Sequence, residues 1–90
     1  MPIRVLIYGK QGDGSAYAAM AQLRSLIREM QADASVQIIT DQRQLEMNGI
    51  TETPSVAVDG TLVSQGYVPS RTEMHRYIQQ RVEVLRGDTG

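Results

Sequence analysis

The sequence contains no cysteine, so no position along it can form a disulfide, supply a thiolate or bind a metal through sulfur. This absence does not identify a compartment, because reduced and oxidised proteins can both lack cysteine. Histidine and lysine are also scarce, with His75 and Lys10 the only examples. A metal site or a catalytic triad would need partners for His75, and the spacing of the other residues indicates neither. We therefore expect no catalytic residue, no metal site and no cofactor.

A basic excess and a long apolar run are missing as well. The formal net charge is -1, whereas proteins that bind nucleic acids usually carry a clear positive charge. No apolar run approaches the length of a membrane span, and residues 1–4 lead into a strand-like segment without the features of a signal peptide. We therefore expect a cytoplasmic protein that binds neither nucleic acid nor membrane. Ninety residues are enough for one domain.

The first half of the chain predicts a strand, a helix and a second strand. Residues 3–8 are a short β-branched and apolar run, typical of a central strand, and residues 36–39 form another. Glycines and short polar residues between positions 10 and 15 predict a loop, in which Asp13 or Ser15 would cap the helix that follows. The helix is predicted from an apolar stripe with helical spacing, which consists of Ala16, Ala19, Met20, Leu23, Ile27 and Met30.

Two further helices are predicted from their capping residues. Asp41 and Gln44 resemble a capping box, and Gly49 is placed to end a short helix that includes Leu45 and Met47. Ser70 and Glu73 form a second capping box, with Pro69 directly before it. The apolar stripe of this last helix consists of Met74, Tyr77, Ile78, Arg81 or Val82, and Leu85.

A β-hairpin is predicted between these two helices. Two alternating runs, 55–58 and 61–64, flank the pair Asp59-Gly60, which is the strongest short-range hairpin signal. The element order is therefore β-α-β-α-β-β-α, which predicts an α/β fold with a mixed four-stranded sheet and helices on both faces. We assign residues 1–84 to this domain and expect residues 85–90 to form a disordered tail.

Two segments of the chain resemble the small thioredoxin-like "redox-active disulfide" proteins. Tyr8-Gly9 matches the start of their Tyr-Gly-x-Gly-Cys-x-x-Cys segment, and residues 51–60 match their Thr-x-x-Pro segment that ends in Asp-Gly. The resemblance extends from residue 3 to about 78, and it implies a thioredoxin fold in which the bond between Thr53 and Pro54 is cis. It also implies that Thr53 pairs its backbone with a bound peptide.

The departure from this family lies at its reactive residues. Gly12 and Ser15 stand where the resemblance places the two cysteines, in the segment Gly12-Asp13-Gly14-Ser15. Glycine has no nucleophile, and a serine hydroxyl is far too weakly acidic to replace a thiol. We therefore expect no thiol–disulfide oxidoreductase activity.

Three functions remain open at this point. The first is a redox-inactive domain that binds a protein or peptide partner through Gly12, Asp13, Gly14, Ser15, Thr53 and Pro54. The second is an accessory protein that binds a small anion or a thiol metabolite at Gly12–Ser15, where a helix N-terminus favours negative charge. Asp13 argues against it, because its carboxylate can cap the same N–H groups. The third is a structural homodimer.

Overall fold

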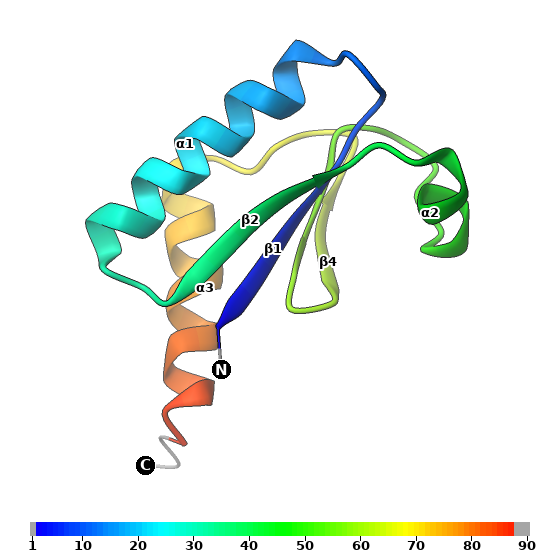
Figure 1. The fold of residues 1–90 in the computed structure, drawn as a ribbon. Helices are drawn as coiled ribbons and strands as arrows, with labels where there is room; N and C mark the ends of the chain where they lie inside the picture. The colour runs from blue at the N-terminus through cyan, green and yellow to red at the C-terminus, as the bar shows by residue number, and fades with distance from the viewer. Residues whose placement is uncertain (1, 88–90) are drawn as a thin grey trace.

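The computed structural model describes residues 2–87 and has seven elements in the order expected from the sequence (Figure 1). The strands and helices are β1 (Ile3–Tyr8), α1 (Gly14–Met30), β2 (Ala34–Ile39), α2 (Gln42–Met47), β3 (Ser55–Val58), β4 (Thr61–Gln65) and α3 (Arg71–Leu85).

The four strands form one mixed sheet in the order β2-β1-β3-β4. β1 pairs with β2 in parallel and with β3 in antiparallel orientation, while β3 and β4 form the hairpin. Helices α1 and α3 lie on one side of this sheet and α2 on the other (Figure 1). The predicted fold class, a mixed four-stranded sheet with helices on both faces, is confirmed.

Successive side chains of β1 point to opposite faces of the sheet, so they belong to two separate core clusters. Ile3, Val5 and Ile7 point toward α1 and α3 and are at most 2% exposed. Leu6 and Tyr8 point to the opposite face, where the smaller cluster also contains Leu45, Ile50 and Ala57. The larger cluster includes Leu26 of α1, a buried residue that the predicted stripe omitted.

Local capping signals explain where the helices begin. Ser70 and Glu73 form the predicted reciprocal capping box at the start of α3. At α2 the Asp41 carboxylate accepts a hydrogen bond from the backbone N–H of Arg43, one residue earlier than a capping box with Gln44 requires. Met47, at the end of α2, is 75% exposed, because residues two positions apart on a helix point to opposite sides and Leu45 faces the smaller core cluster.

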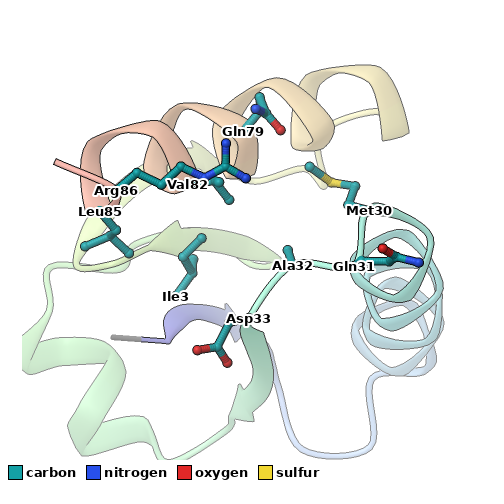
Figure 2. Close-up of a pocket in the computed structure, with 9 residues that line it drawn as sticks. All are labelled: Ile3, Met30, Gln31, Ala32, Asp33, Gln79, Val82, Leu85 and Arg86. Atoms are coloured by element: carbon teal, nitrogen blue, oxygen red, sulfur yellow. The ribbon is translucent and has the colours of Figure 1, made fainter. Parts of the chain in front are cut away.

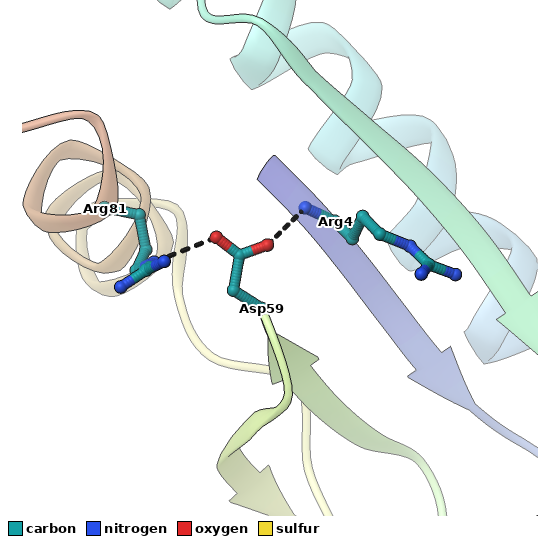
Figure 3. A network of polar contacts seen from close by, with 3 residues as sticks. All are labelled: Arg4, Asp59 and Arg81. Carbon is teal, nitrogen blue, oxygen red and sulfur yellow. Dashed lines mark hydrogen bonds and ion pairs between the residues drawn. The ribbon is translucent and has the colours of Figure 1, made fainter. Parts of the chain in front are cut away.

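The hairpin turn is tied to both β1 and α3. Asp59 and Gly60 have φ angles of 48° and 85°, as a tight hairpin turn requires. The Asp59 carboxylate accepts hydrogen bonds from the backbone N–H of Arg4, at 2.8 Å, and from the Arg81 guanidinium, at 2.9 Å (Figure 3). One side chain therefore connects the hairpin, the first strand and the last helix.

The last helix ends close to the C-terminal limit of the described residues. Leu85 is the last residue of α3, and Arg86 caps that helix. Of the tail expected at 85–90, residues 88–90 lie outside the described residues. Within residues 2–87, no helix has the combined length and apolar character needed to cross a membrane.

Candidate functional site

The loops that carry the predicted site residues lie together at one end of the sheet. The strand register aligns Ile39, Tyr8, Ser55 and Gln65 in a single row across the sheet. The row lies where β1, β2 and β4 end and β3 begins, so the loops beyond it leave the sheet on the same side. The sequence-predicted segments 12–15 and 53–54 therefore belong to neighbouring loops, although about forty residues separate them in the chain.

Close packing brings the start of α1 against the end of β1. A Cβ atom added at Gly9 would lie 2.9 Å from the Cβ of Ala16, which is closer than side chains tolerate. Gly9 also donates its backbone N–H to the Ile39 carbonyl at 3.0 Å. The glycine after β1 thus allows the helix to pass directly over the strand, and this contact sets the position of the loop at 10–13.

Asp13 occupies the N-terminus of α1. Its carboxylate accepts hydrogen bonds from the Ser15 hydroxyl at 2.7 Å and from the Ser15 backbone N–H at 2.9 Å. These two bonds, a bond from the Ala16 N–H and the charge of Lys10 hold the pKa of Asp13 below its usual value. The N-terminus is therefore already supplied with a negative charge by the chain itself. This arrangement disfavours a bound anion at Gly12–Ser15.

The two positions that the resemblance assigns to cysteines differ in backbone conformation. Gly12 has a φ of 82°, a conformation that glycine adopts at little cost, and open space surrounds its Cα. Ser15 lies in the first turn of α1, where its hydroxyl donates to Asp13. Neither position carries a thiol, the group that attacks a disulfide in thiol–disulfide exchange.

Thr53 and Pro54 form the facing segment of the site. Their peptide bond is cis, and both residues are partly exposed directly before β3. Within residues 2–87, neither the N–H nor the C=O of the Thr53 backbone hydrogen-bonds to another backbone group. Buried backbone groups are almost always paired, so unpaired groups at an exposed position are available to water or to a ligand.

Sequence reasoning missed the residues that support this segment. The Gln65 side chain accepts hydrogen bonds from the Thr51 hydroxyl at 2.9 Å and from the Thr51 N–H at 3.2 Å. Gly66, with a φ of 87°, packs so closely on Glu52 that a Cβ at this position would meet the Glu52 carboxylate. The glycine after the fourth strand was the only signal in the sequence that could have indicated this contact.

A hollow of about 320 Å³ lies at the opposite end of the sheet, between the C-terminal ends of α1 and α3 (Figure 2). Ile3, Val82 and Leu85 provide an apolar lining, and Arg86 stands at its rim. The hollow contains none of the predicted site residues. His75 is exposed on α3, and no group of three or more His, Asp or Glu residues within positions 2–87 could hold a metal ion.

The family is shown by a match that covers most of the chain. A model of the thioredoxin domain matches residues 3–79. The chain belongs to the thioredoxin domain family. This thioredoxin domain has no cysteine, and the resemblance seen in its sequence is thereby confirmed at the level of the family.

Solved structures of similar fold show low sequence identity to this thioredoxin domain. A malarial protein is 8% identical with a TM-score of 0.67, and the alignment covers 89% of this chain and 97% of the other. Mitochondrial thioredoxin 3 from Saccharomyces cerevisiae is 16% identical with a TM-score of 0.63, over 87% and 77% of the two chains.

A third neighbour comes from a study of the thiol-resolving mechanism of a yeast mitochondrial 1-Cys peroxiredoxin. It is 15% identical, with a TM-score of 0.64 over 88% of this chain and 78% of the other. No curated protein sequence matches this thioredoxin domain significantly. At these identities the structural neighbours establish the fold alone.

Proposed function

We propose that this protein is a redox-inactive thioredoxin domain that binds an extended peptide of a partner protein at the end of the sheet where residues 12–15 and 53–54 lie. The observation that carries the proposal is the unpaired backbone of Thr53 beside a loop without a thiol. An extended peptide can satisfy both groups by pairing as a short strand, which is a common mode of peptide recognition. The partner would be held by hydrogen bonds rather than by a mixed disulfide.

The loop at 12–15 contributes shape and charge to this site. Gly12 and Gly14 carry no side chain, and a Cβ added at either would meet no atom within 4 Å, so a peptide can approach the backbone there. Asp13 adds a carboxylate that stays ionised at neutral pH, since its pKa is lowered by the hydrogen bonds from Ser15. We therefore expect peptides with a basic or hydrogen-bond-donating residue opposite Asp13 to bind best.

The proposal is tested by selecting binders from a random peptide display library and titrating the selected peptides into isotope-labelled protein. The amide signals of residues 10–15 and 53–55 are expected to shift. Thr53→Pro removes the backbone N–H and should weaken binding by about tenfold, as expected for one lost hydrogen bond with its unpaired partner. The matched control Thr53→Val keeps the N–H and should bind like the wild type.

Two results would contradict the proposal. The selected peptides could shift only the amide signals of residues far from these two loops. Alternatively, Thr53→Pro could bind as tightly as the wild type while retaining a native amide spectrum. Titration with inorganic phosphate and with glutathione provides the comparison for the anion and thiol-metabolite alternative. We expect neither compound to shift residues 10–15, because Asp13 already accepts the N–H groups at the start of α1.

A further inference from the structure

The outer edge of β2 is open. β2 is the first strand in the sheet order and, among the strands formed by residues 2–87, pairs only with β1. Ile3 donates to the Asp33 carbonyl at 2.8 Å and Gly9 donates to the Ile39 carbonyl at 3.0 Å, so the odd-numbered residues of β2 face β1. Because successive residues alternate, the N–H and C=O groups of Ala34, Val36 and Ile38 point away from the sheet.

This edge has none of the features that protect strand edges from pairing. Natural edge strands are usually interrupted by charged residues, proline or a bulge. The other edge of the sheet follows this rule, since a register shift between Val56 and Ala57 breaks the regular pairing of β3 with β4. β2 has six regular residues, 34–39, with no proline, no glycine and no charged side chain. The unprotected edge is therefore suited to accept another strand.

A basic groove runs beside this edge. It has a volume of about 580 Å³ and lies between α1 and the residues 34–36 of β2. Its lining includes Arg24 and Arg28, and it includes no acidic residue. Both arginines are exposed, and neither forms an ion pair with any residue between 2 and 87. Glu29, the acidic neighbour on the same helix, pairs instead with Arg71 of α3.

We propose that the free edge of β2 binds an extended acidic peptide, which joins the sheet as an additional strand and places carboxylates against Arg24 and Arg28. The spacing of the charges supports this geometry. Residues four apart on a helix are separated by about 6 Å along its axis, and alternate residues of a strand by about 6.6 Å. Acidic residues at every second position of the peptide would therefore face the two arginines in turn.

Other occupants fit the edge less well. A second copy that paired β2 with β2 about a two-fold axis would bring its own Arg24 and Arg28 to the same face of the joined sheet, where like charges repel. A nucleic acid could contact the arginines, but it lacks the amide backbone that the unpaired groups of Ala34, Val36 and Ile38 require. An acidic peptide satisfies both the edge and the charges.

The test uses the full chain and a synthetic peptide, acetyl-Thr-Glu-Val-Glu-Val-Glu-Thr-amide, with the same peptide bearing lysine in place of glutamate as its control. Titration into isotope-labelled protein at low salt should shift the amides of residues 24–28 and 34–38 with the acidic peptide alone. Arg24→Glu/Arg28→Glu should weaken binding by about tenfold or more, because two charge contacts become repulsive. The matched variant Arg43→Glu/Arg76→Glu makes the same change in net charge and should bind like the wild type.

A second variant addresses the edge itself. Val36→Pro removes an outward N–H and leaves the bonds to β1 intact, so it should abolish the shifts while the native amide spectrum is retained. Absence of binding, equal binding of the lysine peptide, or no effect of either variant would overturn the proposal. Amide shifts confined to residues 10–15 and 53–55 would also overturn it, while supporting the separate peptide site formed by the loops at the end of the sheet. Self-association through β2 in sedimentation experiments would assign the edge to a second copy instead.

Discussion

Asp59, in the hairpin turn, and Arg81, in the last helix, form a hydrogen-bonded ion pair with Oδ2 and Nε 2.9 Å apart. The Asp59 side chain is 16% exposed and that of Arg81 is 36% exposed, so the pair is partly shielded from water. The other carboxylate oxygen of Asp59 accepts the backbone N–H of Arg4, while the Asp59 N–H donates back to the Arg4 carbonyl. This relationship links three elements that are distant in sequence and gives rise to two predictions.

The first prediction concerns the strength of the pair. Asp59→Asn should lower the free energy of unfolding by about 1–2 kcal/mol, because the amide carries no negative charge and has only one oxygen, so it can accept only one of the two hydrogen bonds from Arg4 and Arg81. Asparagine tolerates the positive φ at this position, so the turn itself is retained. With Arg81→Gln and the double variant, a urea-unfolding cycle should give a coupling energy of about 0.5–1 kcal/mol. Additive effects of the two single changes would show that the pair does not contribute to stability.

The second prediction concerns pH. Partial burial raises the pKa of Asp59, but the Arg4 N–H and the Arg81 guanidinium outweigh it, so the pKa lies below its ordinary value. The unfolded chain then binds more protons than the folded chain near an ordinary aspartate pKa of about 3.9, and stability rises with pH in that range. The contribution of Asp59 is therefore present above about pH 4 and is lost as the pH falls through the folded-state pKa. Urea unfolding between neutral pH and pH 2 should show a smaller loss for Asp59→Asn than for the wild type. Identical losses would contradict the assigned shift.

The third prediction tests the close packing of α1 on β1. Gly9→Ala should destabilise the protein by about 1–3 kcal/mol, because the new methyl group would overlap the Cβ of Ala16. Gly14→Ala is the matched control, since a Cβ at that position meets no atom within 4 Å. Its effect should stay within about 1 kcal/mol, with the sign favouring the helix. Equal thermal midpoints for the two variants would show that the helix can move away from Gly9 at no cost.

The fourth prediction asks whether a thiol at the helix start would be reactive. In Ser15→Cys the new thiol takes the place of a hydroxyl that donates to the Asp13 carboxylate at 2.7 Å. This negative charge should raise the pKa of the thiol and oppose the effect of the helix N-terminus. Asp13→Asn/Ser15→Cys should therefore react with iodoacetamide about tenfold faster at neutral pH, because more thiolate is present.

The absence of cysteine makes this measurement simple, because the unmodified chain provides a background without any thiol. Equal alkylation rates for the single and double variants would show that Asp13 does not influence the position. The expected result would mean that restoring a cysteine is not sufficient to restore a reactive site in this loop.

Much of the fold could be predicted from local sequence signals. Asp59-Gly60 specified the hairpin and Ser70 with Glu73 specified the start of α3, because turns and caps depend on residues within a few positions of each other. The same local logic failed at Leu26, which is buried although the apolar stripe predicted for α1 omitted it. Helical spacing identifies a stripe, but the amount of it that is buried depends on the length of the helix and on the surface that covers it.

The candidate site was only partly accessible from the sequence. Gly12–Ser15 and Thr53-Pro54 were selected through the family resemblance, and the structure places their loops at the same end of the sheet. The support that Gln65 gives to Thr51, and the contact between Gly66 and Glu52, could not be predicted. Both depend on the register between β3 and β4, which is shifted by a bulge that leaves no clear signal in the sequence.

The sequence by itself determined that this chain has no thiol, which elements it forms and in what order. These conclusions follow from composition, periodicity and short-range hydrogen bonding, all of which are local properties of the chain. Only the tertiary structure decided that Tyr8 pairs with Ser55, that Thr53 keeps an unpaired backbone and that β2 has an open edge beside Arg24 and Arg28. The reason is that strand order and register bring together residues far apart in the chain, and burial of the shared core selects among the possible pairings.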